Sequence, residues 1–226
     1  MNLPKPEDYI DIHTHGSVPM PGIFSVETLL AHENRKPEET TGMTFTAGIH
    51  PWHLSEDNQE EQLKFVREVA GDKNLIAIGE AGFDRLRGPS FGLQRKIFED
   101  QVRLAEGCNK PVVIHCVKAW DELLAAHKKL RPRLPWLVHG FRGRKELADQ
   151  LIARGMYLSF WFDFVVRQES EDLLNHLPVE RIFLETDGAD IPISDIYSKA
   201  GSHLNLPVDI LKGNIFSNFI QFFNIK

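Results

Sequence analysis

The feature that most constrains the fold is a repeated alternation of short apolar segments with longer segments of helical period. Leu75–Ile78, Val112–Ile114 and Ile182–Leu184 are almost continuously apolar, whereas Ser90–Gly107 spaces its apolar residues along one helical face. Apolar strands separated by amphipathic helices are typical of parallel sheets that are buried on both faces. The alternation therefore predicts an α/β fold.

The number of apolar segments predicts a specific architecture. Counting Ile23–Leu29, which fits either a strand or a short helix, the chain holds eight candidate strands, the number in a (β/α)8 TIM-type barrel. The gap from Gly16 to Gly22 is too short for a normal parallel crossover. We therefore expect a barrel that is irregular in its first βα unit, or a strand there that is missing or reversed. Helices are expected over about 55–70, 90–107, 119–130, 144–154, 169–176 and 208–223.

The net charge, the cysteine content and the absence of long apolar runs exclude several classes of protein. The formal net charge of −6 argues against a general polyanion-binding surface, and two cysteines are too few for a disulfide framework. Residues 1–8 hold no apolar core for a signal peptide, and no run approaches membrane-spanning length. No linker divides residues 1–226. We expect one domain, in the cytoplasm, with no membrane contact and no obligate protein partner.

Two histidines end the first apolar segment. His13 and His15 are one residue apart, so in a strand both imidazoles point to the same face. Two neutral imidazoles form half of a site for a divalent cation. By themselves they are more simply surface residues at a strand end, because two ligands leave a metal under-coordinated.

The same kind of residue recurs after the later apolar segments. These residues are His50, Glu80, His115, His139 and Asp187. In a parallel barrel the carboxyl ends of the strands converge on one face, where active sites are built. With His13 and His15, and leaving His50 aside, the set offers four imidazoles and two carboxylates. That is enough for two divalent ions if one carboxylate bridges them.

Six short motifs carry these residues in order along the chain. They are Asp11–His15, Ala47–Pro51, Ile78–Asp84, Pro111–Cys116, Val138–Gly143 and Leu184–Asp187. Together they resemble the TatD-like metal-dependent hydrolases, often called TatD-type DNases, of the amidohydrolase superfamily. The resemblance implies hydrolysis of phosphodiester bonds in DNA, in several members as an exonuclease, with zinc, manganese or magnesium as the ions used.

The resemblance also implies a role for each matched position. The expected metal ligands are His13, His15, Glu80, His115, His139 and Asp187. His13, His15 and Asp187 would hold one ion, and His115 and His139 the other. Glu80 would bridge the two ions, and Asp187 would orient or deprotonate the attacking water. Asp187 and Glu80 are therefore the expected catalytic residues.

The chain departs from the family pattern on the substrate side. Val117, followed by Lys118, stands where an arginine is usual, and Arg142 replaces a small hydroxyl residue. After Asp187, Gly188-Ala189-Asp190 replaces the usual Ala-Pro-Tyr or Ser-Pro-Tyr, and the arginine- and asparagine-containing loop is absent. Basic residues after several strands still favour an anionic substrate. The expected substrate contacts are His50, Lys118 and Arg142.

Three functions remain open from the sequence. The leading one is a metal-dependent phosphodiesterase or nuclease acting on an anionic phosphodiester such as DNA. The second is an amidohydrolase acting on a small ester, lactone or amide. That class often bridges its metals with a carboxylated lysine, whereas no lysine ends a strand before His115 and Glu80 takes the bridging place. The third is a metal-binding protein that has lost catalysis.

Overall fold

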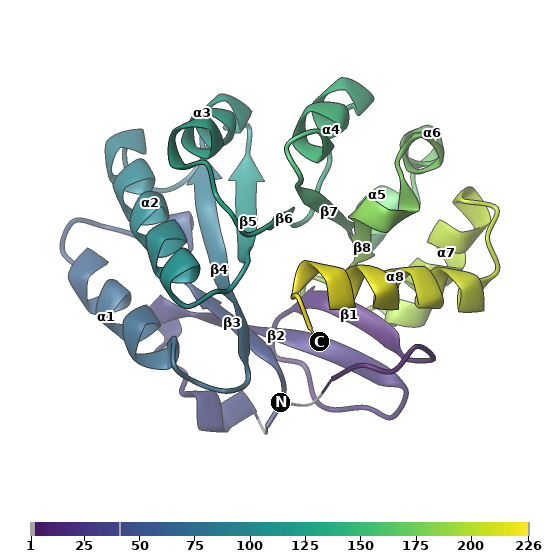
Figure 1. Ribbon diagram of the computed structural model, residues 1–226, viewed down its shortest axis with the longest axis horizontal. Helices are drawn as coiled ribbons and strands as arrows, with labels where there is room; N and C mark the ends of the chain where they lie inside the picture. Colours follow the sequence, from purple (N-terminus) through teal and green to yellow (C-terminus); the bar gives the residue numbers. More distant parts are fainter. Residues whose placement is uncertain (1–2, 41, 226) are drawn as a thin grey trace. The chain divides into compact units, whose positions relative to one another are not determined.

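The computed structural model describes residues 3–40 and 42–225 (Figure 1). The first two residues of the N-terminal segment, in which no signal peptide is expected, lie outside this part. Residue contacts group the chain into two compact units, Thr28–Leu137 in one and residues 3–27 with 138–225 in the other. The single domain expected over 1–226 stays a prediction.

The strands follow chain order in the sheet, from β1 to β8, as a (β/α)8 topology requires. Pairing is parallel for β1 with β2, β3 with β4, β4 with β5, and β7 with β8. The strands are β1 (Tyr9–Thr14), β2 (Ile23–Leu30), β3 (Phe45–Gly48), β4 (Leu75–Asp84), β5 (Val112–Val117), β6 (Trp136–Val138), β7 (Tyr157–Phe160) and β8 (Ile182–Leu184). Short 3-10 helices lie at Ala31–Glu33, Pro37–Thr40, Pro51–His53 and Val179–Arg181.

In the first unit, one helix joins each pair of consecutive strands from β3 to β6 (Figure 1). These helices are α1 (Gln59–Val69), α2 (Phe91–Gly107) and α3 (Trp120–Leu130). The expected apolar face of α2 is buried, from Leu93 through Ile97 and Phe98 to Val102. Each such side chain contributes about 1.5–3 kcal/mol on burial. This face is therefore what holds α2 on its strands, and truncating Phe98 would cost about 3–5 kcal/mol.

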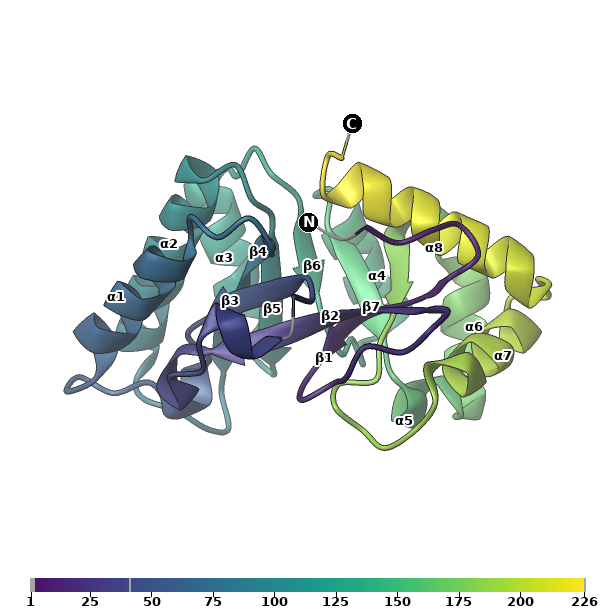
Figure 2. The same ribbon diagram turned by 90° about the horizontal axis from the view of Figure 1, so that it is seen from below.

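The second unit holds the remaining helices, and neighbouring ones pack together at its C-terminal end (Figure 2). They are α4 (Lys145–Ile152), α5 (Phe162–Val165), α6 (Gln168–His176), α7 (Ile193–His203) and α8 (Val208–Phe222). Sequence reasoning missed α5 and α7. In α7, Ile193, Ile196, Tyr197 and Ala200 are buried at helical spacing. The Tyr197 hydroxyl donates to the Ile10 carbonyl at 3.1 Å, which ties α7 to β1.

The first βα unit is irregular, as predicted. No helix lies within residues 15–22, yet β2 runs parallel to β1, with Tyr9 opposite Ile23. Eight extended residues span up to about 26–29 Å, which is enough to return alongside a six-residue strand. The Glu27 carboxylate holds this link by accepting hydrogen bonds from the backbone N–H groups of Gly16 (2.8 Å) and Ser17 (3.0 Å). The strand is therefore neither missing nor reversed.

Candidate metal and catalytic site

Glu80 lies inside β4 and not at its end, so the predicted end of this strand is wrong. The strand continues to Asp84, past Gly79 and Gly82, whose φ angles are +141° and +153°. A Cβ at either glycine would overlap backbone atoms of β5, which only glycine avoids. The two glycines thus let β4 run close against β5, with Gly82 in register with His115. Both carboxylates of β4 are brought next to that histidine.

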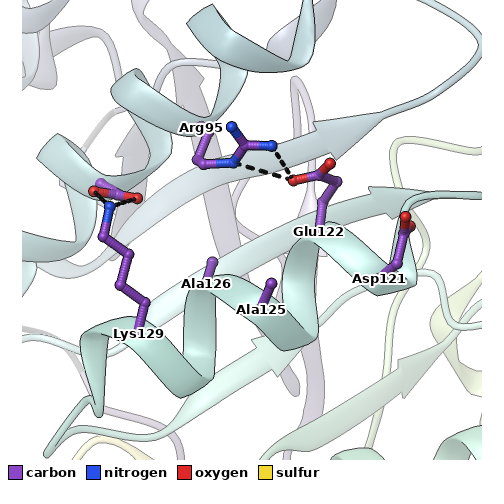
Figure 3. Close-up of a pocket in the computed structure, with 7 residues that line it drawn as sticks. Arg95, Asp121, Glu122, Ala125, Ala126 and Lys129 are labelled. Atoms are coloured by element: carbon purple, nitrogen blue, oxygen red, sulfur yellow. Dashed lines mark hydrogen bonds and ion pairs between the residues drawn. The ribbon is translucent and has the colours of Figure 1, made fainter.

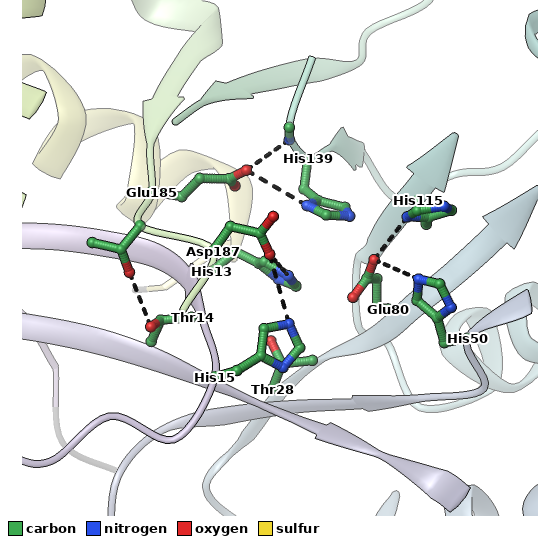
Figure 4. A network of polar contacts seen from close by, with 12 residues as sticks. His13, Thr14, His15, Thr28, His50, Glu80, His115, His139, Glu185 and Asp187 are labelled. Carbon is green, nitrogen blue, oxygen red and sulfur yellow. Dashed lines mark hydrogen bonds and ion pairs between the residues drawn. The ribbon is translucent and has the colours of Figure 1, made fainter. Parts of the chain in front are cut away.

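Two buried histidines of the first unit converge on one oxygen of the buried Glu80 carboxylate (Figure 4). The Glu80 Oε1 atom lies 3.0 Å from His115 Nδ1 and 3.1 Å from His50 Nε2. One potential ligand atom from each residue lies within 4.8 Å of the others, close enough for a shared metal ion. His50 was expected to contact substrate, and the structure places it in this group.

The protonation of His50 follows from its backbone partner. The Trp52 backbone N–H donates to His50 Nδ1 at 3.0 Å, so a neutral imidazole carries its proton on Nε2. That Nε2–H then donates to Glu80 Oε1. With both ring nitrogens engaged in this way, His50 is suited to orienting Glu80 and poorly suited to binding a metal.

The protonation of His115 is the reverse. Its Nε2 lies 3.1 Å from Asp84 Oδ2, and an ionised carboxylate can only accept, so Nε2 carries the proton. In a neutral ring the Nδ1 lone pair then faces Glu80 Oε1 at 3.0 Å. Two acceptors at this distance require a proton or a cation between them. A divalent metal ion satisfies both, so the donor chemistry fits a metal site.

Asp84 is held in its ionised form. Burial would raise its pKa, but hydrogen bonds from His115, Trp52 and the Leu86 backbone lower the pKa to about 2. The Trp52 indole Nε1–H donates to the same Oδ2 as His115, at 2.5 Å. A carboxylate that fixes the orientation and tautomer of a ligating histidine is a common feature of metal sites.

The second unit contains a separate donor group. His13 Nε2 and His15 Nε2 lie 3.6 and 3.7 Å from Asp187 Oδ1 (Figure 4). Ligands of one tetrahedral zinc ion are separated by about 3.3 Å, given bonds of about 2.0–2.1 Å. The side chain of His13 is fully buried, whereas that of Asp187 is 30% exposed. Asp187 and His15, which is 31% exposed, are therefore the members of this group that water or a substrate can reach.

His139 packs against His13, with ring centroids 4.2 Å apart, and is oriented by Glu185. Its Nδ1 lies 3.5 Å from Glu185 Oε1, which also accepts the Gly140 backbone N–H at 2.7 Å. Burial would raise the pKa of Glu185, but the hydrogen bond and charge of His139 lower it. With Nδ1 turned to a carboxylate, Nε2 of His139 is left to serve as a ligand, as Nδ1 is in His115.

The backbone around Asp187 is fixed by Asp11. The Asp11 carboxylate accepts hydrogen bonds from the backbone N–H (2.9 Å) and the hydroxyl (2.6 Å) of Thr186, and burial raises its pKa to about 7. The Asp187 backbone N–H donates to the His13 carbonyl at 3.1 Å, and its φ of +52° is unusual for a residue other than glycine. Such backbone conformations are concentrated at functional sites.

Two expected substrate residues lie at the margins of these groups. Lys118 follows β5 directly and is exposed, and its carbonyl accepts a hydrogen bond from Arg85. Arg142 is exposed and stacks on Trp161, with the guanidinium carbon 4.2 Å from the ring centroid. Sequence reasoning missed Asp84, Glu185 and Asp11 as site residues, although each lay within a recognised motif. Their acidic character was visible, but their contacts were not.

Comparison with known proteins gives the relatives of this chain. The family model of the TatD related DNases matches residues 22–206. The 3'-5' ssDNA/RNA exonuclease TatD of Cronobacter turicensis is 35% identical over 171 residues, 74% of this chain and 65% of that protein. The protein of the same name from Escherichia coli K12 is 32% identical over 170 residues, 73% and 65% of the two chains. The chain thus spans slightly less than two thirds of these relatives.

Solved structures give the same fold. A TatD homolog from Escherichia coli K12 superposes with a TM-score of 0.78 at 22% identity, covering 98% of this chain and all of the other. A TatD family hydrolase from Entamoeba histolytica gives 0.76 at 18% identity, covering 96% and 98%. A dihydroorotase gives 0.62 at 13% identity, covering 97% and 72%. The expected (β/α)8 fold class is confirmed.

Within the described part of the chain, none of the helices has the length and apolarity needed to cross a lipid bilayer. The match over residues 22–206 covers most of the 226 residues, and it agrees with the resemblance seen in six motifs of the sequence. The chain belongs to the TatD-related DNase family.

Proposed function

We propose that the protein is a metal-dependent hydrolase that cleaves phosphodiester bonds in nucleic acid, most specifically a DNase-type nuclease. Membership of the TatD-related DNase family supports the reaction class, and the names of the curated relatives support a single-stranded DNA or RNA substrate. Because the chain spans only 65% of those relatives, its activity and substrate are proposed from its own residues as well.

The observation that carries this proposal is the contact between His115 and Glu80. Asp84 occupies the proton-bearing nitrogen of His115, so in a neutral ring the other nitrogen presents a lone pair to Glu80 Oε1 at 3.0 Å. A purely structural histidine would place a hydrogen-bond donor there. The arrangement is instead suited to two ligands that share a cation.

The proposed ligands of two divalent ions are His13, His15, Glu80, His115, His139 and Asp187, with zinc, manganese and magnesium as the candidate metals. Bound ions would activate a water and neutralise charge on the phosphoryl oxygens. Asp187 is proposed to take the proton of that water, because it supplies the carboxylate of its group and that carboxylate is partly exposed. Glu80, which accepts from His50, is proposed as the bridging ligand.

Two further expectations belong to this proposal. The substrate is an anionic phosphodiester, with Lys118 and Arg142 as candidate contacts beside the donor groups. A cytoplasmic location is proposed because both cysteines, Cys108 and Cys116, are free thiols. Burial also raises the pKa of the Cys116 thiol, so it is not a ready nucleophile that would compete with a hydrolytic mechanism.

Hydrolysis of an end-labelled single-stranded oligonucleotide tests the proposal. With added manganese we expect stepwise shortening of the strand, which stops when a chelator is added and is abolished in His115→Ala. The exposed His176→Ala, whose ring pairs with Asp149 at 2.8 Å, serves as the matched control and should keep full activity. No cleavage of DNA, RNA or a chromogenic phosphodiester with manganese, magnesium or zinc would reject the nuclease. Turnover in a panel of lactones and amides would then point to an amidohydrolase.

A further inference from the structure

A concave feature of the second unit lies outside the donor groups. It is a pocket of about 360 Å3, which we call the basic pocket, at the small end of the range for small-molecule sites. Its charged lining residues are Arg142, Arg144, Lys145, Arg167, Glu146 and Glu169. Four cations thus face two carboxylates, in a chain whose overall charge is negative.

The cations of the basic pocket are not held in ion pairs with neighbouring side chains. Within residues 3–40 and 42–225, none of these four charged side chains makes a salt bridge or a hydrogen bond. A groove between α2 and α3 in the first unit shows the opposite case (Figure 3). There Arg95 pairs with Glu122 at 2.7 Å, and Lys129 pairs with Glu99 at 2.6 Å. The cations of that groove are thus paired with carboxylates of the groove itself, whereas the four cations of the basic pocket are available to a ligand.

Arg142 is fixed in place at the edge of the basic pocket. Its guanidinium stacks on the Trp161 ring, which limits the conformations of a long side chain. Partial burial lowers the pKa of Arg142; of the nearby charges, Asp163 acts most strongly and raises the pKa, and Arg167 lowers it. Two arginines that repel each other across a pocket are both stabilised when an anion binds between them.

The backbone adds positive potential to the same place. Arg144 precedes the first turn of α4, and Arg167 precedes the first turn of α6. The first N–H groups of a helix have no partner within it, and the helix dipole places partial positive charge at that end. These ends reinforce an attraction for anions that the four side chains already create.

The basic pocket lies next to the candidate catalytic residues of its own unit. Arg142 follows His139 by only three residues, and the charges of Asp187 and Glu185 raise its pKa against the effect of burial. An anion in the pocket would therefore lie near, but apart from, the bond that is cleaved. A polymer with regularly spaced phosphates provides an anion in that position.

We propose that the basic pocket binds a backbone phosphate of a single-stranded nucleic acid, one that neighbours the scissile phosphate. This inference rests on the proposed nuclease function and extends it to strand recognition. Arginine forks match phosphate oxygens, and the half-buried Trp161 ring beside Arg142 offers a surface for a base.

Strand binding tests the inference directly. The probe is a fluorescein-labelled phosphorothioate oligothymidylate, which resists cleavage, bound to the metal-loaded protein and followed by fluorescence anisotropy. The double variant Lys145→Gln/Arg167→Gln should weaken binding at least about tenfold, since hydrogen bonds to charged groups contribute about 1.5–3 kcal/mol. The slope of log affinity against log salt should become shallower by about 0.7 for each phosphate that the variant no longer neutralises.

A matched control comes from the same helix. Arg154 is exposed just beyond the C-terminal end of α4, and its side chain bonds only the Gln150 carbonyl among the described residues, so Arg154→Gln removes one positive charge away from the pocket. It should bind the strand with wild-type affinity and salt slope. All substituted side chains are exposed, and circular dichroism verifies the fold. Equal affinity and slope in the double variant and the wild type would overturn the inference.

The two proposals fail in different ways. In one outcome the wild type binds the strand, the double variant does not, and no phosphodiester is hydrolysed. This outcome supports phosphate binding by the basic pocket and rejects the nuclease function. In the other outcome unmodified DNA is cleaved, but the double variant binds the strand as the wild type does. This outcome supports the nuclease function and rejects phosphate binding by the basic pocket.

Discussion

Replacing Asp84 with asparagine tests the assignment of His115 as a metal ligand without touching a ligand. The Asp84 Oδ1 atom accepts the backbone N–H groups of Leu86 (2.7 Å) and Arg87 (3.0 Å). Its Oδ2 atom accepts the Trp52 indole and His115 Nε2. The single oxygen of asparagine will stay with the two backbone donors. The amide NH2 group of the asparagine then faces His115 and donates a hydrogen bond to Nε2. The imidazole proton therefore moves to Nδ1, where it points at Glu80 and prevents this nitrogen from binding a cation.

The size of the effect follows from these hydrogen bonds. Removing a partner that orients a metal ligand typically lowers metal affinity by about 10–100-fold, or about 1.4–2.7 kcal/mol. The Trp52 indole N–H is also left without its acceptor. Since Trp52 is 39% exposed, water can replace part of that bond, and we expect a loss of stability of about 1 kcal/mol. For a chain of this length, that corresponds to a fall in Tm of about 2–4 °C.

Calorimetric titration of zinc or manganese into protein stripped by a chelator measures the change, and thermal unfolding verifies the fold. Asp121→Asn is the control, because Asp121 is an exposed carboxylate paired with Arg85 at 2.6 Å. It should bind metal as the wild type does. A folded Asp84→Asn protein with an affinity within about twofold of the wild type would refute the tautomer argument, and with it the role of His115.

Three further predictions follow from the same structure. Asp187→Asn should lower kcat on a chromogenic phosphodiester at least about a hundredfold with little change in KM; near-normal kcat in a folded variant would leave Asp187 as a structural ligand at most. Glu80→Ala should reduce bound metal well below the expected two ions per chain, and normal content by elemental analysis would rule out its bridging role. Burial would raise the pKa of Glu99, but Lys129 lowers it below its ordinary 4.5. Glu99→Gln should therefore unfold more easily than the wild type at pH 7, by about 1 kcal/mol, and the difference should shrink as pH falls below 4.5; a difference unchanged by pH would contradict the ion pair.

Much of the fold could be predicted because buried strands and helices require apolar residues in regular patterns along the sequence. A parallel strand that is covered on both faces must be apolar throughout, as Trp136–Val138 and Ile182–Leu184 are, and their bounds match the structure. Helix α7 was missed although Ile193, Ile196 and Tyr197 are spaced for it, because its start follows Pro192 in a segment that sequence reasoning assigned to a shortened loop. Local signals of helix and loop competed there, and packing decided between them.

The candidate ligands were visible in the sequence because residue type and position after a strand are local properties. That Asp84 bonds His115, thirty-one residues away, depends on how closely β4 approaches β5 at Gly79 and Gly82. The tautomers of His50 and His115 likewise depend on partners that only folding supplies. In the same way, Arg167 becomes part of the basic pocket with Arg142 only when β7 and its helices follow β6 in the sheet. The sequence determined which chemical groups are available, and the tertiary structure decided which of them meet and where each proton resides, because strand register and backbone approach are set by interactions between distant segments.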